Sequence, residues 1–298
     1  MPGETVALPN FFCVGAQKAG TTTLFNILRQ HPDIYLPSNK EAWFFHKDDK
    51  YKKGISWYEK EYFSKCSVER AVGEISPDYM YFEKVPERIR RDLGKNIRFI
   101  FILRNPADRA YSHYLMTVFR GIERELFDRA IILEKERIER GFWEKIHFSY
   151  VTRGKYYEQI SRYLRYFPKK QMLFLIFEEN IKTNINFTIG EVLNFLEVNN
   201  IELNTNVNRN PAVEPRSKYL RDIIRQTNPI KRVSRAIIPF PSIRSWVRKF
   251  IEKLNQQRCS VSSLDPSLKM RIINDYFMDD IKKLEKLLER DLSFWYMY

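Results

Sequence analysis

Short apolar runs alternate with amphipathic stretches over the first 200 residues of the chain. Continuous apolar runs of four to six residues are typical of strands buried on both faces of a sheet, and here they predict strands at 11–14, 98–103 (apolar from Phe99) and 172–177. Apolar residues at helical spacing predict helices at 24–28, 85–93, 106–119, 156–167 and 185–196. This alternation predicts an α/β fold in which helices cover both faces of a central parallel sheet.

The pattern changes after Asn199, where a polar, turn-rich segment extends to Pro215. Asp265 and Pro266 then form a helix start. The apolar residues beyond them keep to one helical face: Met270, Ile273, Phe277, Ile281, Leu284 and Leu288. We therefore predict a single domain over 1–298, with an α/β core over about 8–200 and a basic loop and helical extension over about 201–298.

Composition narrows the class of protein. The chain has 298 residues, of which 44% are hydrophobic and 30% charged, and this excludes a disordered chain. Three cysteines, at 13, 66 and 259, cannot close a disulfide framework, which favours a reducing compartment and a cytoplasmic protein. We predict no signal peptide, because residues 1–10 contain no basic segment followed by an apolar run, and no transmembrane helix, because no apolar run approaches ~18 residues. The net charge of +14 favours an anionic partner.

The segment between the first strand and the first helix, Gly15 to Thr23 (GAQKAGTTT), is predicted to bind a phosphate, because a helix N-terminus favours an anion. Gly15, Gly20 and Thr22 fit the nucleoside-triphosphatase pattern G-x-x-x-x-G-K-[ST]. Thr21 stands in place of its lysine, and Lys18 lies three residues earlier. Lys18 is therefore expected to project from the loop toward a shorter anion than a triphosphate.

The loop resembles that of sulfotransferases that use 3′-phosphoadenosine 5′-phosphosulfate (PAPS). A second feature of this family is a strand ending in Arg, with Ser eight residues later, which matches Arg104 and Ser112 in FILRNPADRAYSHY. The resemblance implies that these two residues bind the 3′-phosphate of the nucleotide. It assigns the 5′-phosphosulfate to Gln17, Lys18, Ala19, Gly20, Thr21, Thr22 and Thr23. The expected product is adenosine 3′,5′-bisphosphate (PAP).

Further segments resemble the Golgi heparan sulfate sulfotransferases and their bacterial relatives. They are KEAWFF at 40–45, GISWY at 54–58, GEISPDY at 73–79, RGKY at 153–156 and PRSKYL at 215–220. The resemblance implies nucleotide contacts for Arg153, Gly154, Tyr156, Arg216 and Ser217. One position departs from the family, because Ile75 stands where the glycan enzymes carry Lys, and this weakens any transfer of acceptor specificity.

The implied activity is that of a PAPS-dependent sulfotransferase (EC 2.8.2 type). The sulfuryl group would pass by in-line displacement to a hydroxyl or amine, and the expected acceptor is a carbohydrate. Lys18 would stabilise the charge on the leaving phosphate. The resemblance makes Glu41 the base that takes the acceptor's proton. His46 is the alternative base, and it would suit a small-molecule or lipid acceptor. No metal is required, and no cluster of residues has metal-ligand spacing.

Two other classes are disfavoured. A P-loop kinase would need a lysine at Thr21 and an evident magnesium-binding aspartate. A nucleic-acid-binding protein is not supported by any helix-turn-helix, zinc-finger or RNP-type signature, so no nucleic-acid partner is expected.

A basic stretch extends from Arg216 to Lys253 and contains eleven Lys and Arg against two Asp and Glu. It has three interpretations: a solvated face, contact with an acidic glycan, or peripheral attachment to an anionic membrane. The acceptor and the oligomeric state are left open.

Overall fold

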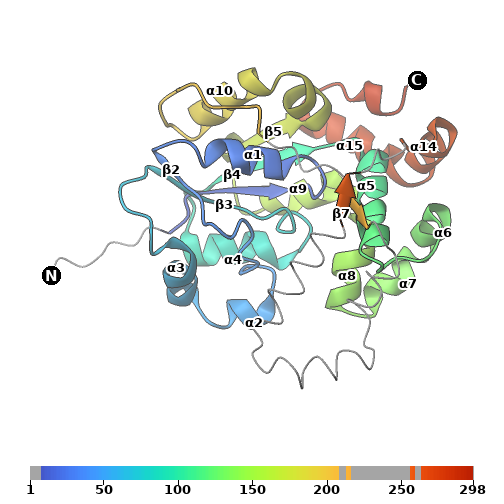
Figure 1. Ribbon diagram of the computed structural model, residues 1–298, viewed down its shortest axis with the longest axis horizontal. Coiled ribbons are helices and arrows are strands. Elements are labelled where there is room, and N and C mark those ends of the chain that lie inside the picture. The colour runs from blue at the N-terminus through green and yellow to red at the C-terminus, as the bar shows by residue number, and fades with distance from the viewer. Residues whose placement is uncertain (1–7, 208–212, 216–255, 259–262, 298) are drawn as a thin grey trace. The chain divides into compact units, whose positions relative to one another are not determined.

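The computed structural model describes residues 8–207, 213–215, 256–258 and 263–297 (Figure 1). The chain divides into two compact units. The first comprises 1–110, 151–209 and 265–298, and the second comprises 111–150 and 210–264. The expectation of one domain over the whole chain stays a prediction, and the two units are described separately.

The first unit contains a five-stranded parallel sheet in the order β2-β3-β1-β4-β5. Its strands are β1 (Phe11–Gly15), β2 (Ile34–Tyr35), β3 (Ala71–Ile75), β4 (Arg98–Leu103) and β5 (Met172–Ile176). Every residue of the central strand β1 is buried, as its continuous apolar run predicts. The predicted central parallel sheet is confirmed.

Helices lie on both faces of this sheet, with α1 and α10 on one face and α4 on the other (Figure 1). The bounds are α1 (Thr21–Leu28), α2 (Asp48–Tyr51), α3 (Ile55–Phe63), α4 (Lys84–Leu93), α9 (Tyr156–Leu164) and α10 (Ile185–Phe195). Helix α5 (Pro106–Phe119) begins in the first unit, where the Asn105 side chain caps it by accepting from the N–H groups of Ala107 and Asp108. Parallel neighbours such as β1 and β3 need crossover connections, and helices in these connections cover the faces of the sheet.

The C-terminal extension packs on this core, as predicted. It is divided into α14 (Pro266–Ile272), a π-helical turn (Ile273–Phe277) and α15 (Met278–Leu288), where the sequence pattern predicted one helix. The turn brings Phe277 against Gly154, where an added Cβ would lie 2.7 Å from the ring. Farther along, the buried Trp295 accepts a hydrogen bond from the Asn105 side chain on its carbonyl oxygen, at 3.0 Å. The extension therefore reaches the carboxyl end of β4.

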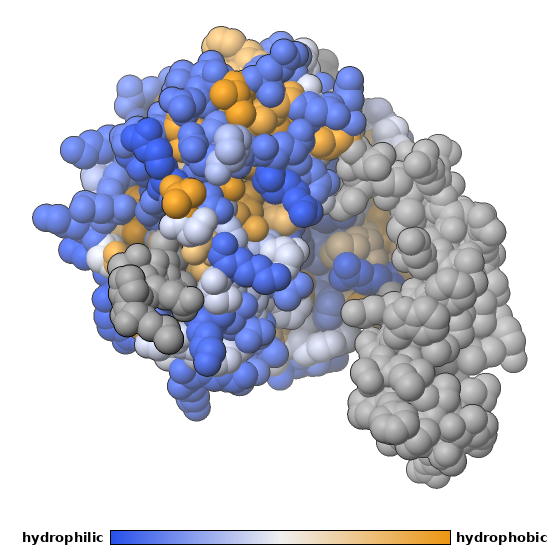
Figure 2. Space-filling view, turned by 60° about the vertical axis from the view of Figure 1, so that its left-hand side comes forward, coloured by the Kyte–Doolittle hydropathy of each residue, from blue (hydrophilic) through white to orange (hydrophobic). Residues whose placement is uncertain are grey.

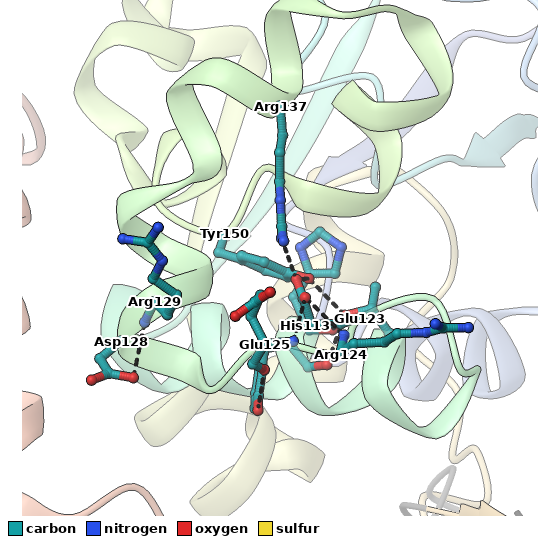
Figure 3. A network of polar contacts seen from close by, with 10 residues as sticks. His113, Glu123, Arg124, Glu125, Asp128, Arg129, Arg137 and Tyr150 are labelled. Carbon is teal, nitrogen blue, oxygen red and sulfur yellow. Dashed lines mark hydrogen bonds and ion pairs between the residues drawn. The ribbon is translucent and has the colours of Figure 1, made fainter.

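The second unit contains most of α5 together with α6 (Phe127–Ile132), α7 (Glu134–Glu139) and α8 (Phe142–Phe148). It also holds an antiparallel pair, β6 (Val213–Pro215) and β7 (Gln256–Arg258). Figure 3 shows the polar network around its buried Glu123, whose carboxylate pairs with Arg137 at 2.6 Å and accepts from the Tyr150 hydroxyl at 2.9 Å. A buried carboxylate needs such partners, and these join the segment after α5 to α7 and to the residues after α8 within this unit.

The described surface is mostly polar on the face that Figure 2 shows, with smaller apolar areas between the polar side chains. Within the first unit, Val68 and Phe187 are among the large apolar residues left exposed. Across the described ranges, no helix has both the length and the apolar character needed to cross a bilayer.

Candidate functional site

The predicted phosphate loop lies between β1 and α1. Gly20 adopts a φ of 91°, and an added Cβ there would lie 2.9 Å from Ile181, so glycine suits both the conformation and the space. Lys18 also has a left-handed φ, of 71°. The Ala16 N–H donates to the Ile102 carbonyl at 2.7 Å, which ties the loop to β4. At the start of α1 the N–H groups of Thr23 and Leu24 donate to the Gly20 carbonyl, so an anion at this helix end would be bound by the N–H groups of Thr21 and Thr22.

Residues of the loop differ in burial. Thr21 and Ala19 are buried, whereas Gln17, Lys18, Gly20, Thr22 and Thr23 are half-buried. The Gln17 side-chain oxygen is buried and accepts no hydrogen bond from any described residue. An unsatisfied acceptor of this kind favours a donor from a bound molecule.

Arg104 follows β4 directly and reaches the loop. Its Nη1 donates to the Lys18 carbonyl oxygen at 3.0 Å, and its guanidinium lies over the Phe177 ring at 4.9 Å. The Tyr156 hydroxyl donates to the Arg104 carbonyl at 2.8 Å and holds the strand end in place. The structure therefore brings Arg104 and the phosphate loop together. Ser112 lies half-buried on α5, within the second unit.

Lys40 and Glu41 lie beside the same loop. The Lys40 ammonium donates to the hydroxyls of Thr21 at 3.1 Å and Thr22 at 3.3 Å, and to Glu41 at 3.3 Å. The other Glu41 oxygen accepts from the Trp43 indole N–H at 3.0 Å. The Glu41 side chain keeps 30% of its surface exposed, so a solvent-borne acceptor can reach it.

A buried carboxylate, that of Glu74, fixes the segment that carries Lys40 and Glu41. Glu74 of β3 is fully buried and accepts from the Ala42 N–H at 2.9 Å, the Tyr58 hydroxyl at 2.5 Å and the Tyr79 hydroxyl at 3.1 Å. The Tyr79 hydroxyl in turn accepts from the N–H of Phe44 at 3.1 Å. Burial raises the pKa of Glu74, and these donors oppose that rise. The network fixes the backbone that carries Glu41.

Replacing Glu74 with glutamine is expected to lower the free energy of unfolding by about 1–3 kcal/mol, because an amide cannot accept from both tyrosine hydroxyls and the Ala42 N–H. Urea denaturation measures this loss. The matched control is Glu61→Gln, since Glu61 is exposed on α3 and its replacement should leave the unfolding midpoint in place. Equal midpoints for the two variants would contradict the anchoring role of Glu74.

His46, the alternative base, lies in an aromatic cluster. Its ring stacks on Phe82 at 4.8 Å and contacts Trp43 and Tyr79 at 5.8 and 5.6 Å between ring centroids. It is 6% exposed, and this burial lowers the pKa of His46 to about 4. The imidazole is therefore neutral at pH 7 and weakly basic.

The predicted nucleotide contacts of the Arg153 segment occupy packing positions. Arg153 is buried, pairs with Asp78 at 2.6 Å and lies over the Tyr81 ring at 4.5 Å. Gly154 packs against Phe277, and Tyr156 binds the Arg104 backbone. Arg216 and Ser217 lie outside the described residues. The nucleotide roles of all five stay predictions. No group of three His, Cys, Asp or Glu placed to hold a metal occurs in the part of the chain that the structure describes.

Comparison with known proteins identifies the family. The family model of the sulfotransferase domain matches residues 8–255. The chain belongs to the sulfotransferase family. The predicted family and its enzyme class, EC 2.8.2, are thereby confirmed.

Individual sulfotransferases are similar over different lengths. A solved sulfotransferase from Alicyclobacillus acidocaldarius is 28% identical, with a TM-score of 0.69, and the match covers 97% of this chain and 99% of that one. Heparan sulfate glucosamine 3-O-sulfotransferase 5 from Homo sapiens is 33% identical over 55% of this chain and 46% of its own length. Membrane-associated sulfotransferase kil1 from Dictyostelium discoideum is 36% identical over 39% of this chain and 24% of its own length. The matches therefore span less than half of these two curated relatives.

Proposed function

We propose that this sulfotransferase takes its sulfuryl group from PAPS and transfers it to a hydroxyl or amine of a carbohydrate. The observation that carries the proposal is the hydrogen bond from Arg104 to the Lys18 carbonyl at 3.0 Å. It holds a guanidinium against a loop whose N–H groups and hydroxyls suit a phosphate, so cation and loop can share one nucleotide. The similarity to a heparan sulfate sulfotransferase supports a glycan acceptor.

The proposed roles follow from chemistry and position. The loop from Gln17 to Thr23 holds the 5′-phosphosulfate, and Lys18 neutralises the bridging oxygen as charge develops there. Arg104 and Ser112 bind the 3′-phosphate. Arg153, Gly154, Tyr156, Arg216 and Ser217 complete the nucleotide site in this proposal. The few cysteines of the chain favour a cytoplasmic location.

Glu41 is the proposed base. Its carboxylate is partly exposed and lies next to an ammonium that also contacts the phosphate loop. His46, by contrast, is buried, and burial lowers its pKa to about 4. An acceptor therefore reaches the imidazole less easily than Glu41, and the imidazole is a weaker base than an exposed histidine. This contrast favours Glu41 over the alternative of a His46 base acting toward a small-molecule or lipid acceptor.

Isothermal titration calorimetry tests the nucleotide. PAP is expected to bind without Mg²⁺, and adenosine 5′-monophosphate, which lacks the 3′-phosphate, about 10- to 100-fold more weakly, as expected for lost charge-assisted hydrogen bonds. Arg104→Ala should remove most of this preference, whereas Lys60→Ala on the exposed face of α3 should leave it intact. If ATP with Mg²⁺ bound far more tightly than PAP, the proposal that PAPS is the sulfuryl donor would fail.

A further inference from the structure

Lys40 lies between the phosphate loop, which is the proposed donor site, and Glu41, the proposed base. Its side chain is 17% exposed, and its ammonium lies within 3.3 Å of both Thr22 in the phosphate loop and Glu41. The segment that carries it is fixed at Ala42 by the buried Glu74. A lysine held in this way is placed by the fold as well as by attraction to its neighbours.

The chemistry of transfer defines what must lie at this point. The acceptor oxygen attacks sulfur, the bond from sulfur to the bridging oxygen breaks, and PAP leaves with that electron pair. The acceptor proton passes to the Glu41 carboxylate. The sulfonate therefore travels from the loop side toward the base side, and the Lys40 ammonium is within hydrogen-bond distance of groups on both sides.

We propose that Lys40 is a catalytic residue that binds the non-bridging sulfonate oxygens during transfer; this inference rests on the proposed function. An ammonium that contacts a sulfonate in a site shielded from water stabilises the negative charge on its oxygens. Lys40 takes no part in the proton transfer, because Glu41 accepts the proton that the acceptor loses.

The contacts to Thr21 and Thr22 support the same placement. A hydroxyl has one proton and two lone pairs, so a threonine that accepts from Lys40 keeps its proton for another acceptor. In the proposed complex that acceptor is an oxygen of the 5′-phosphate. Lys40 thus orients the hydroxyls toward the nucleotide, and in the proposed complex the sulfonate accepts the third N–H, which Glu41 accepts in the described structure.

The alternative is an ordinary ion pair between adjacent residues. Partly exposed pairs of this kind contribute little to stability, about 0–1 kcal/mol, and would leave nucleotide recognition unchanged. The two interpretations predict different effects of Lys40 on affinity: a sulfonate contact strengthens binding of PAPS more than of PAP, whereas an ion pair affects neither.

Affinities for PAPS and PAP, measured by calorimetry without acceptor, separate them. Lys40→Met is expected to weaken PAPS about 10-fold or more, with a much smaller effect on PAP, because only PAPS carries the sulfonate. The same variant should slow sulfuryl transfer to desulfated heparin, the probe acceptor, and release of sulfate from PAPS alone, each about 100-fold. Lys40→Arg keeps the charge and should recover part of both losses, and Lys60→Met is the matched control.

Each other outcome has a definite meaning. Equal weakening of PAPS and PAP would place Lys40 at the 5′-phosphate and overturn the sulfonate assignment. Unchanged affinities and rates would reduce Lys40 to an ion pair and overturn it as well. If the unmodified chain bound neither nucleotide, the proposed function itself would fail. Thermal unfolding of each variant checks that it is folded.

Discussion

Replacing Lys18 with alanine is expected to lower the rate of sulfuryl transfer about 10²- to 10³-fold, the usual cost of removing one group that stabilises developing charge. The fold should persist. Lys18 has a φ of 71°, and because lysine and alanine both carry a Cβ, the backbone conformation costs the two residues about the same. The Lys18 carbonyl, which accepts from Arg104, is unchanged by the substitution.

The measurement is single-turnover transfer from PAPS to desulfated heparin, with thermal unfolding recorded alongside. Lys60→Ala removes one positive charge from the exposed face of α3 and should leave the rate within about twofold, since distant exposed charges are screened by salt. If the Lys18→Ala variant kept its full rate, Lys18 would have no part in the reaction, and another cation of the site would stabilise the leaving group.

Local patterns were sufficient for the elements that build the phosphate loop. The strand predicted at 98–103 from its apolar run has the bounds of β4, and the Asn105-Pro106 pair predicted the start of α5. These signals depend on residues a few positions apart, and both faces of β4 are covered as a buried parallel strand requires. The loop glycines and threonines likewise carry their signal within nine residues.

Other parts of the site depend on partners far apart in the sequence. Strand β3 was not predicted from its hydrophobic pattern, because Gly73 and Glu74 interrupt the apolar run. Glu74 is nevertheless fully buried, since its donors come from positions 42, 58 and 79. In the sequence alone, a glutamate of this kind is read as a surface residue, because the donors that allow its burial are brought together only in the fold.

Lys40 illustrates the same limit at the reaction site. In the sequence, Lys40 has no predicted role beyond its place in the segment KEAWFF, whereas its contacts with the loop join residues 18 and 19 positions apart. Ile75, which stands where related glycan enzymes carry Lys, is fully buried at the end of β3. Besides Arg104, a second positive charge beside the loop therefore comes from Lys40, in a segment whose position only the folded chain reveals.

Replacing Glu41 with glutamine is expected to lower kcat about 10²- to 10⁴-fold, the range found when a general base is removed, while affinity for PAP stays near that of the unmodified chain. Glutamine is similar in shape, and its amide oxygen can still accept from the Trp43 indole, so the segment should keep its position. The substitution removes the capacity to take the acceptor proton, together with the negative charge that pairs with Lys40.

His46→Asn provides the comparison that decides between the two bases. Because the His46 ring is buried among Trp43, Tyr79 and Phe82, its loss should lower the unfolding midpoint but cost much less in kcat than Glu41→Gln. Glu61→Gln, an exposed carboxylate on α3, controls for the change of charge. The reverse ranking, with Glu41→Gln active and a stably folded His46→Asn inactive, would assign the proton to the imidazole. It would also shift the expected acceptor from a glycan toward a small molecule or lipid.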